Sequence, residues 1–274
     1  MDTRTIMATM VIFICAAAQV SAQEEGVRSQ SNIEEPPQVE EGQIVPVAPP
    51  IDYVAWNSIL SVYLNADGKF DYSGLMGHEE HMAGLEQMIQ QIGSASISQW
   101  EEDDQLAFWI NAYNILTVKG VLDNYPLDSV LDVTGFFNGI HYRAGGESLT
   151  LNDIENERIR AVFNEPRIHF AVNCASDGCP PLRAEAYEGT LLERQLEEQT
   201  VLFLQRTTRI DSNTMEIHVS KLFEWFSGDF EGEQGEGSVR SFLTRYLDAE
   251  SRPALENAEN RLVFEEYDWA LNAP

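Results

Sequence analysis

Residues 106–122, which read LAFWINAYNILTVKGVL, are apolar on nearly every side of a helix. Such a helix lies inside a protein, because a surface helix needs a polar face toward water. Asn111 and Asn114 are three residues apart and therefore share one face of it. Since a buried amide without a hydrogen-bond partner costs about 1–3 kcal/mol, both side chains must find partners. They either anchor the backbone of a neighbouring loop or line a functional site.

The remaining pattern predicts short helices and strands around this central helix. Apolar residues recur at helical spacing over 52–64, after His78, and over 154–163, 191–204 and 239–247. β-Hairpins are expected over 140–151 and 209–218, with a further strand at 262–264. Ser98 and Glu101 fit a capping box that would start the central helix. The expected fold class is α+β, a single domain with a buried central helix packed on a small antiparallel sheet.

The N-terminal residues have the pattern of a targeting segment. Arg4 supplies a positive charge, and residues 7–18 form an apolar run that is too short to span a membrane. Residues 20–22, Val-Ser-Ala, fit cleavage after Ala22, so 1–22 is predicted to be a signal peptide. Residues 23–50, rich in proline and glutamate, predict a disordered acidic tether, and the folded domain is expected over 51–274. The mature protein is therefore expected to be exported, either periplasmic or secreted.

The charge of the chain limits its partners. The sequence has 17 Lys+Arg against 45 Asp+Glu, a formal net charge of −28. Such an acidic protein repels phosphates and anionic lipid headgroups, so neither nucleic acid nor membrane insertion is expected. The expected partner is an unknown small molecule or a protein. His78 and His81 lack an obvious third ligand, so no metal and no cofactor is expected.

Residues 167–182, RIHFAVNCASDGCPPL, carry the side chains best suited to chemistry. Alternation from Ile168 to Asn173 predicts a strand that leads into a tight loop. Cys174 and Cys179 in this loop are the two cysteines that remain after signal cleavage. In an oxidising compartment they are expected to form a disulfide, which for so short a loop contributes about 2 kcal/mol.

Several segments together resemble the family known as domain of unknown function 547. They are AFWINAYN at 107–114, Tyr125-Pro126, LNDIE at 151–155, the stretch 167–182 and YDWALN at 267–272. They follow the order of the family and span most of 51–274, but the resemblance implies no established activity. The buried helix with a small sheet bearing histidines also distantly resembles the core of papain and transglutaminase enzymes. In those enzymes the nucleophilic cysteine starts the helix, whereas this helix offers Asn111.

Three functions are compatible with the residues of this loop. In a binding or scaffold domain, the interpretation preferred from the sequence, Cys174 and Cys179 form a structural disulfide. In a cysteine-dependent hydrolase or acyl transferase, Cys174 is the nucleophile and His169 or His141 the base. A redox couple is the third, although the spacing differs from that of thioredoxin-type sites.

The hypotheses also assign roles to further residues. In the enzyme hypothesis, Asn111 would orient the imidazole or stabilise an oxyanion. The strand prediction counts against a pair of His169 and Cys174, because the two side chains would lie on opposite faces. Residues expected to take part in binding are Asn114, Asn173, Asp177 and Glu155.

Overall fold

Helix α4 (Glu102–Asn124) lies at the centre of the fold, as its sequence predicts. The computed structural model describes residues 51–230 and 239–274, and in it every residue from Leu106 to Leu122 except Lys119 is buried. The predicted signal peptide and tether, residues 1–50, lie outside the described residues. The predicted capping box is wrong, because Glu101 itself is the N-cap residue and makes no side-chain cap bond. Carboxylates in the first turn complement the helix dipole instead.

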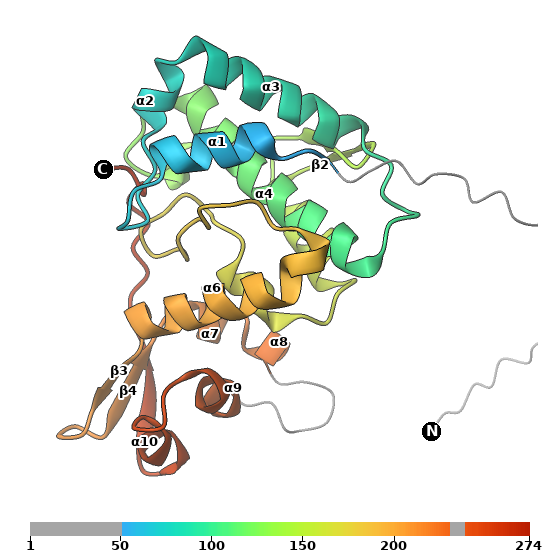
Figure 1. Ribbon diagram of the computed structural model, residues 1–274. Helices are drawn as coiled ribbons and strands as arrows, with labels where there is room; N and C mark the ends of the chain where they lie inside the picture. Colours follow the sequence, from blue (N-terminus) through green and yellow to red (C-terminus); the bar gives the residue numbers. More distant parts are fainter. Residues whose placement is uncertain (1–50, 231–238) are drawn as a thin grey trace, which may run out of the picture. The chain divides into compact units, whose positions relative to one another are not determined.

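The first apolar cluster surrounds α4 with the helices of the N-terminal part of the domain. These are α1 (Val54–Tyr63), α2 (Tyr72–Met76) and α3 (Glu79–Ser94), which lie together in Figure 1. The predicted hairpin is present as β1 (Tyr142–Ala144) and β2 (Glu147–Leu149), paired antiparallel. Gly145 and Gly146 between them adopt φ of +60° and +82°, which glycine tolerates without the steric cost of a Cβ.

The connection from the hairpin to the central stretch is helical. A 3₁₀ turn, η1 (Val130–Asp132), precedes the hairpin, and α5 (Leu151–Asp153) follows it. The next residues form a π-helix, η2 (Ile154–Arg160), within the span where the sequence predicts a helix. π-Helical turns are rare and occur frequently at functional sites.

The second apolar cluster contains the C-terminal elements, which lie around α6 in Figure 1. They are α6 (Leu192–Thr207), β3 (Arg209–Asp211), β4 (Glu216–Val219), α7 (Leu222–Trp225), α8 (Ser227–Phe230), α9 (Val239–Tyr246), α10 (Arg252–Glu256) and β5 (Arg261–Phe264), whereas η4 (Gly189–Leu191) precedes α6 and contacts α4. The helices and strands predicted at 191–204, 209–218, 239–247 and 262–264 are thereby confirmed to within a few residues.

The three-stranded sheet corrects one part of the predicted architecture. β3 pairs with β4 antiparallel, but β4 pairs with β5 parallel, so the sheet is mixed. Its buried residues Ile217 and Val219 belong to the second cluster, whereas the apolar residues of α4 belong to the first. The fold is mixed helix and sheet, as predicted, and the small antiparallel sheet beside the central helix is the β1–β2 hairpin, whose Ala144 and Leu149 belong to the first cluster.

The predicted strand from Ile168 to Asn173 is also wrong, because Pro166–Phe170 forms a 3₁₀ helix, η3. Pro166 occupies its first turn, and the Glu165 side chain accepts a hydrogen bond from the Arg167 amide. The segment runs between the clusters, with Ile168 in the first and Phe170 in the second. Every residue from 168 to 173 is buried, so the alternation of side-chain types did not correspond to an inner and an outer face.

The C-terminal tail returns to the centre of the domain. Backbone amides of Asp177 and Gly178 donate to the carbonyls of Ala270 and Asp268, and the Asn272 amide donates to Ala175. This pairing confirms the docking tail predicted at 267–272, and it holds the tail against the cysteine loop. Among the described residues, no helix is long and apolar enough to cross a membrane.

Candidate functional site

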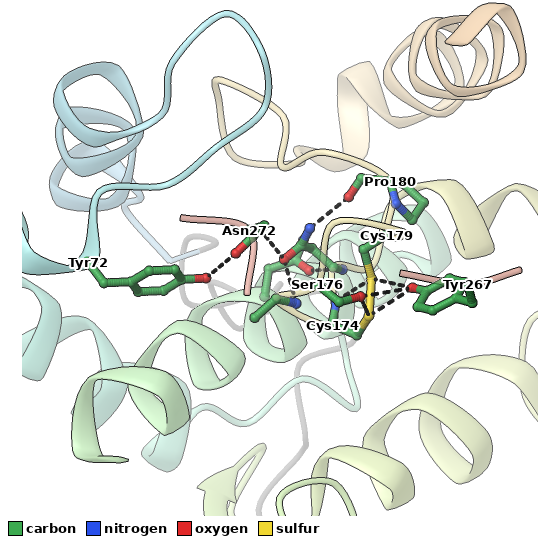
Figure 2. The surroundings of a disulfide bond; sticks show 10 residues. Tyr72, Cys174, Ser176, Cys179, Pro180, Tyr267 and Asn272 are labelled. Carbon is green, nitrogen blue, oxygen red and sulfur yellow. Dashed lines mark hydrogen bonds between the residues drawn. A yellow bond between two sulfur atoms is a disulfide. The ribbon is translucent and has the colours of Figure 1, made fainter. Parts of the chain in front are cut away.

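Cys174 and Cys179 form the predicted disulfide, with Cα atoms 6.1 Å apart. The Asn173 side chain braces the loop that they close, because its Nδ2 donates to the Pro180 carbonyl at 2.7 Å and its Oδ1 accepts from the Ala175 amide at 2.9 Å. Figure 2 shows this loop between the Tyr72–Asn272 pair on one side and Tyr267 on the other. A buried hydrogen bond of 2.7 Å joins the Tyr72 hydroxyl to Asn272 Oδ1.

The amides of the central helix anchor backbone. Asn114 donates to the Ala171 carbonyl at 2.9 Å and accepts from the Asn173 amide at 2.8 Å. Asn111 does the same with both backbone groups of Tyr187, at 2.8 and 2.9 Å. Each asparagine thus satisfies two buried polar groups that would otherwise be costly. Asn114 supports the cysteine loop, whereas Asn111 supports a different segment.

A cavity of about 310 Å³ lies beside the disulfide, where the two apolar clusters meet. Pockets for small ligands begin at about this size and favour apolar and aromatic walls with a few polar groups. Aromatic side chains form much of this wall. The lining residues are Tyr113, Phe137, Asn152, Glu155, His169, Val172, Cys174, Cys179, Pro180, Leu222, Trp225, Phe226, Tyr267 and Trp269.

Glu155 is the one carboxylic acid among these lining residues. It is the second residue of the π-helix η2, and it lies close to Tyr113 of the central helix. Burial raises the pKa of the Glu155 carboxyl above its ordinary value, since water is excluded from the charged form. His169, Tyr113 and Arg160 oppose this shift but do not reverse it.

His169, Arg160 and Asp229 form a polar cluster at the edge of the cavity. His169 Nε2 lies 2.6 Å from Asp229 Oδ2, and Arg160 donates to both oxygens of the same carboxylate, at 2.6 and 2.9 Å. Burial alone would raise the pKa of Asp229, but these hydrogen bonds and charges outweigh it and lower the pKa well below its ordinary value. The carboxylate therefore accepts the His169 N–H. The His169 ring also stacks on Phe226, at a centroid distance of 4.1 Å.

The sulfur atoms at the cavity wall contact hydroxyl groups. The Tyr267 hydroxyl lies 3.1 Å from the Sγ atoms of both cysteines, and the Ser176 hydroxyl lies 3.0 Å from Cys174 Sγ (Figure 2). Burial raises the pKa of the Tyr267 phenol, so this group stays protonated. Tyr267 also packs against Trp225 and Trp269, which continue the aromatic wall.

The structure brings four of the predicted site residues into one cavity, namely Cys174, Cys179, His169 and Glu155. The parity argument against pairing His169 with Cys174 does not apply, since the segment is not a strand. His141 lies elsewhere. It is exposed, does not line this cavity, and bonds through Nδ1 to the Gly139 carbonyl at 3.3 Å.

The remaining predicted binding residues surround the loop without lining this cavity. Asn114 and Asn173 hold the loop backbone, as described above. Asp177 does not line the cavity and forms an ion pair with Lys69. Within the described parts of the chain, no group of three or more His, Cys, Asp or Glu side chains is placed to hold a metal ion.

Sequence reasoning did not identify the other residues of the site. Tyr113, Trp225 and Phe226 lie in segments that the sequence marks only as helical or aromatic, and Tyr267 and Trp269 lie in the tail. The clustering of aromatic residues near 221–226 and 267–269 was the available signal. It does not reveal by itself that the two segments meet.

Residues 97–204 match the model of a protein family described as protein of unknown function, DUF547. This confirms the predicted resemblance over a span that is shorter than half of the chain and includes the motifs from 107 to 182. The matched span ends before the tail, so the resemblance of YDWALN at 267–272 stays a prediction. No curated protein and no solved structure matches the chain, and the distant likeness to papain and transglutaminase stays a prediction too.

Proposed function

We propose that residues 51–274 form a binding domain for a small organic molecule, which occupies the cavity beside the disulfide. The observation that carries this proposal is the aromatic wall, which continues from Tyr113 on the central helix to Trp225 and the tail residues Tyr267 and Trp269. Trp225 is 45% exposed although it is a large apolar residue, so part of the wall is open to solvent. Large exposed aromatic groups beside a cavity are typical of ligand sites.

A screen of small aromatic and aliphatic compounds by ligand-observed NMR tests this proposal. Compounds that bind the cavity should lose binding in Trp225→Ala and keep it in Leu131→Ala, a control that removes another exposed apolar side chain outside the cavity. If no compound distinguishes these two variants, the proposed site is wrong.

The disulfide supports a structural role for the cysteine loop. A sulfur held in a disulfide is not a thiolate and cannot act as a nucleophile. The tail pairs with this loop, so the disulfide also fixes the segment that presents Tyr267 to the cavity. We propose that the bond holds the cavity wall in place.

A thiol-dependent hydrolase or acyl transferase, distantly similar to papain or transglutaminase, is the second candidate. It is favoured by the shared cavity of Cys174, His169 and Glu155, but it requires reduction of the disulfide first. Intact mass after alkylation decides between the two. A binding domain with a structural disulfide adds no alkyl group before reduction and two after it. An enzyme with an active thiol holds both cysteines reduced in the native protein, so it is alkylated without added reductant, and Cys174 reacts before Cys179 near neutral pH.

We also propose that the domain is exported. A disulfide persists in oxidising compartments, which supports this location. The predicted cleavage after Ala22 is tested by expressing the full chain and sequencing the N-terminus of the mature protein. A mature protein that begins at Gln23 supports the proposal, whereas one that retains Met1 contradicts it.

A further inference from the structure

The charges around the cavity are unequal in a way that bears on its ligand. Of the fourteen described residues that line it, Glu155 carries a carboxyl and none is a lysine or an arginine. Arg160, the nearby cation, already binds both oxygens of Asp229 and lies over the Phe226 ring, 4.8 Å from its centroid. His169 shares the same carboxylate. The Arg160–His169–Asp229 group is therefore paired within itself. His169 and Arg160 lower the pKa of Glu155 from nearby, against the larger effect of burial, but within the described parts of the chain no lysine, arginine or histidine forms an ion pair with it.

The walls suit a positive charge as well. The faces of Trp and Tyr rings carry partial negative charge and attract ammonium groups, most strongly where water is excluded. Trp225, Tyr267 and Trp269 form a contiguous aromatic set, with ring centroids 4.7–6.0 Å apart. Tyr113 adds a further ring close to the Glu155 carboxyl.

We infer that the ligand of this cavity is an organic cation, an ammonium compound with an apolar body. Its charge pairs with the Glu155 carboxylate, and its body contacts the aromatic wall. The inference rests on the proposed binding function and adds the chemical class of the ligand. The net charge of −28 favours the same class, because an acidic protein concentrates cations near its surface and repels anions.

A matched pair of probes tests the charge directly. Choline carries a trimethylammonium group, and 3,3-dimethyl-1-butanol has the same shape with carbon in place of the charged nitrogen. Benzyltrimethylammonium extends the comparison to a larger body, and benzenesulfonate supplies an anion. Titration calorimetry on the purified protein should show that the cations bind. The affinity for the neutral alcohol should be lower by at least about tenfold, since an ion pair in a partly buried site contributes about a factor of ten to the affinity. Benzenesulfonate should not bind.

Two variants on the same element locate the charge. Glu155→Gln keeps the size of the side chain and removes its charge. It should lower the affinity for the cations by about tenfold or more and leave the affinity for the neutral alcohol unchanged. Glu157→Gln is the matched control, because Glu157 lies two residues further along η2, is exposed and does not line the cavity. It should bind all probes as the unmodified protein does.

The possible failures are distinguishable. Equal affinity for choline and its neutral counterpart would overturn the cation inference and leave the binding cavity standing. Equal affinity for choline in the Glu155 and Glu157 variants would show that Glu155 is not the partner of the charge. If neither these probes nor any compound of the wider screen binds, the proposed function itself is overturned.

Discussion

Replacing Asn114 with alanine tests how the central helix supports the cysteine loop. Asn114 is buried, and its amide pairs with the Ala171 carbonyl and the Asn173 amide. Alanine leaves both backbone groups without a partner, in a segment where every neighbour is buried, at a cost of about 1–3 kcal/mol each. Water that enters the space left by the side chain would recover part of this loss. We expect Asn114→Ala to lower the free energy of unfolding by about 3 kcal/mol.

Urea denaturation followed by circular dichroism measures this change. In a domain of this size, about 3 kcal/mol corresponds to a fall in melting temperature of roughly 6–12 °C. Asn138→Ala, at an exposed position, is the control and should change the stability by less than about 0.5 kcal/mol. If Asn114→Ala is no more destabilising than this control, the two hydrogen bonds do not stabilise the fold as argued.

Asn111→Ala separates stability from function. Asn111 makes the same two kinds of hydrogen bond as Asn114, but to Tyr187. We therefore expect a similar loss of stability, about 3 kcal/mol. Only Asn114→Ala should also lower the affinity for ligands of the cavity, since of the two asparagines only Asn114 holds the backbone that leads to Cys174. Equal effects of the two variants on binding would contradict this assignment.

Two shorter predictions concern the disulfide and the partly buried ion pair of Arg160 and Asp229. The double variant Cys174→Ser/Cys179→Ser should be about 2 kcal/mol less stable than the oxidised protein in urea denaturation, and no less stable than the reduced one. Asp229→Asn should lower the stability at pH 7 by about 1–3 kcal/mol, a range that allows for the partial exposure of Asp229. Because the pKa of Asp229 is lowered by folding, its contribution is present above the pKa of the unfolded carboxyl, about 3.9, and is lost on acidification. In thermal melts, the difference in melting temperature between the unmodified protein and Asp229→Asn should therefore become smaller from pH 6 to pH 3. A difference that stays constant would contradict the ion pair.

The local elements of this fold could be predicted from the sequence, since each depends on a pattern within one segment. The continuous apolar run of α4, the Gly145-Gly146 hairpin and the cysteine pair all belong to this class. The segment at 166–170 was misassigned because its surroundings are apolar on every side. Alternation of side chains indicates a strand only where one face of the strand meets water or a polar layer.

The candidate site could be predicted only in part, because its residues come from distant segments. His169 and Asp229 are 60 residues apart, and Tyr267 lies 93 residues from Cys174. No local pattern states that these residues meet. The stretch 167–182 could be identified because it concentrates cysteine, histidine and asparagine in a few positions. The aromatic wall could not, since aromatic residues in a helix or a tail are ordinarily part of the core.

The pH dependence of cation binding follows from the environment of Glu155. Burial raises the pKa of this carboxyl, so in acid the free protein holds it protonated, and a cation must displace the proton. Affinity for benzyltrimethylammonium should therefore increase with pH, by up to about tenfold per pH unit, until Glu155 is ionised in the free protein, and stay constant above that.

The other titratable groups that interact with Glu155 are Tyr113, Arg160, His169, Asp229 and Tyr267. The tyrosines stay protonated, and Arg160 and Asp229 stay charged over the range from pH 5 to 8. Calorimetric titrations of Glu155→Gln over the same range test the assignment, since this variant lacks the carboxyl and keeps the neighbouring groups. A flat profile in the variant assigns the dependence to Glu155, whereas a profile as steep as that of the unmodified protein contradicts a direct pairing of the cation with Glu155.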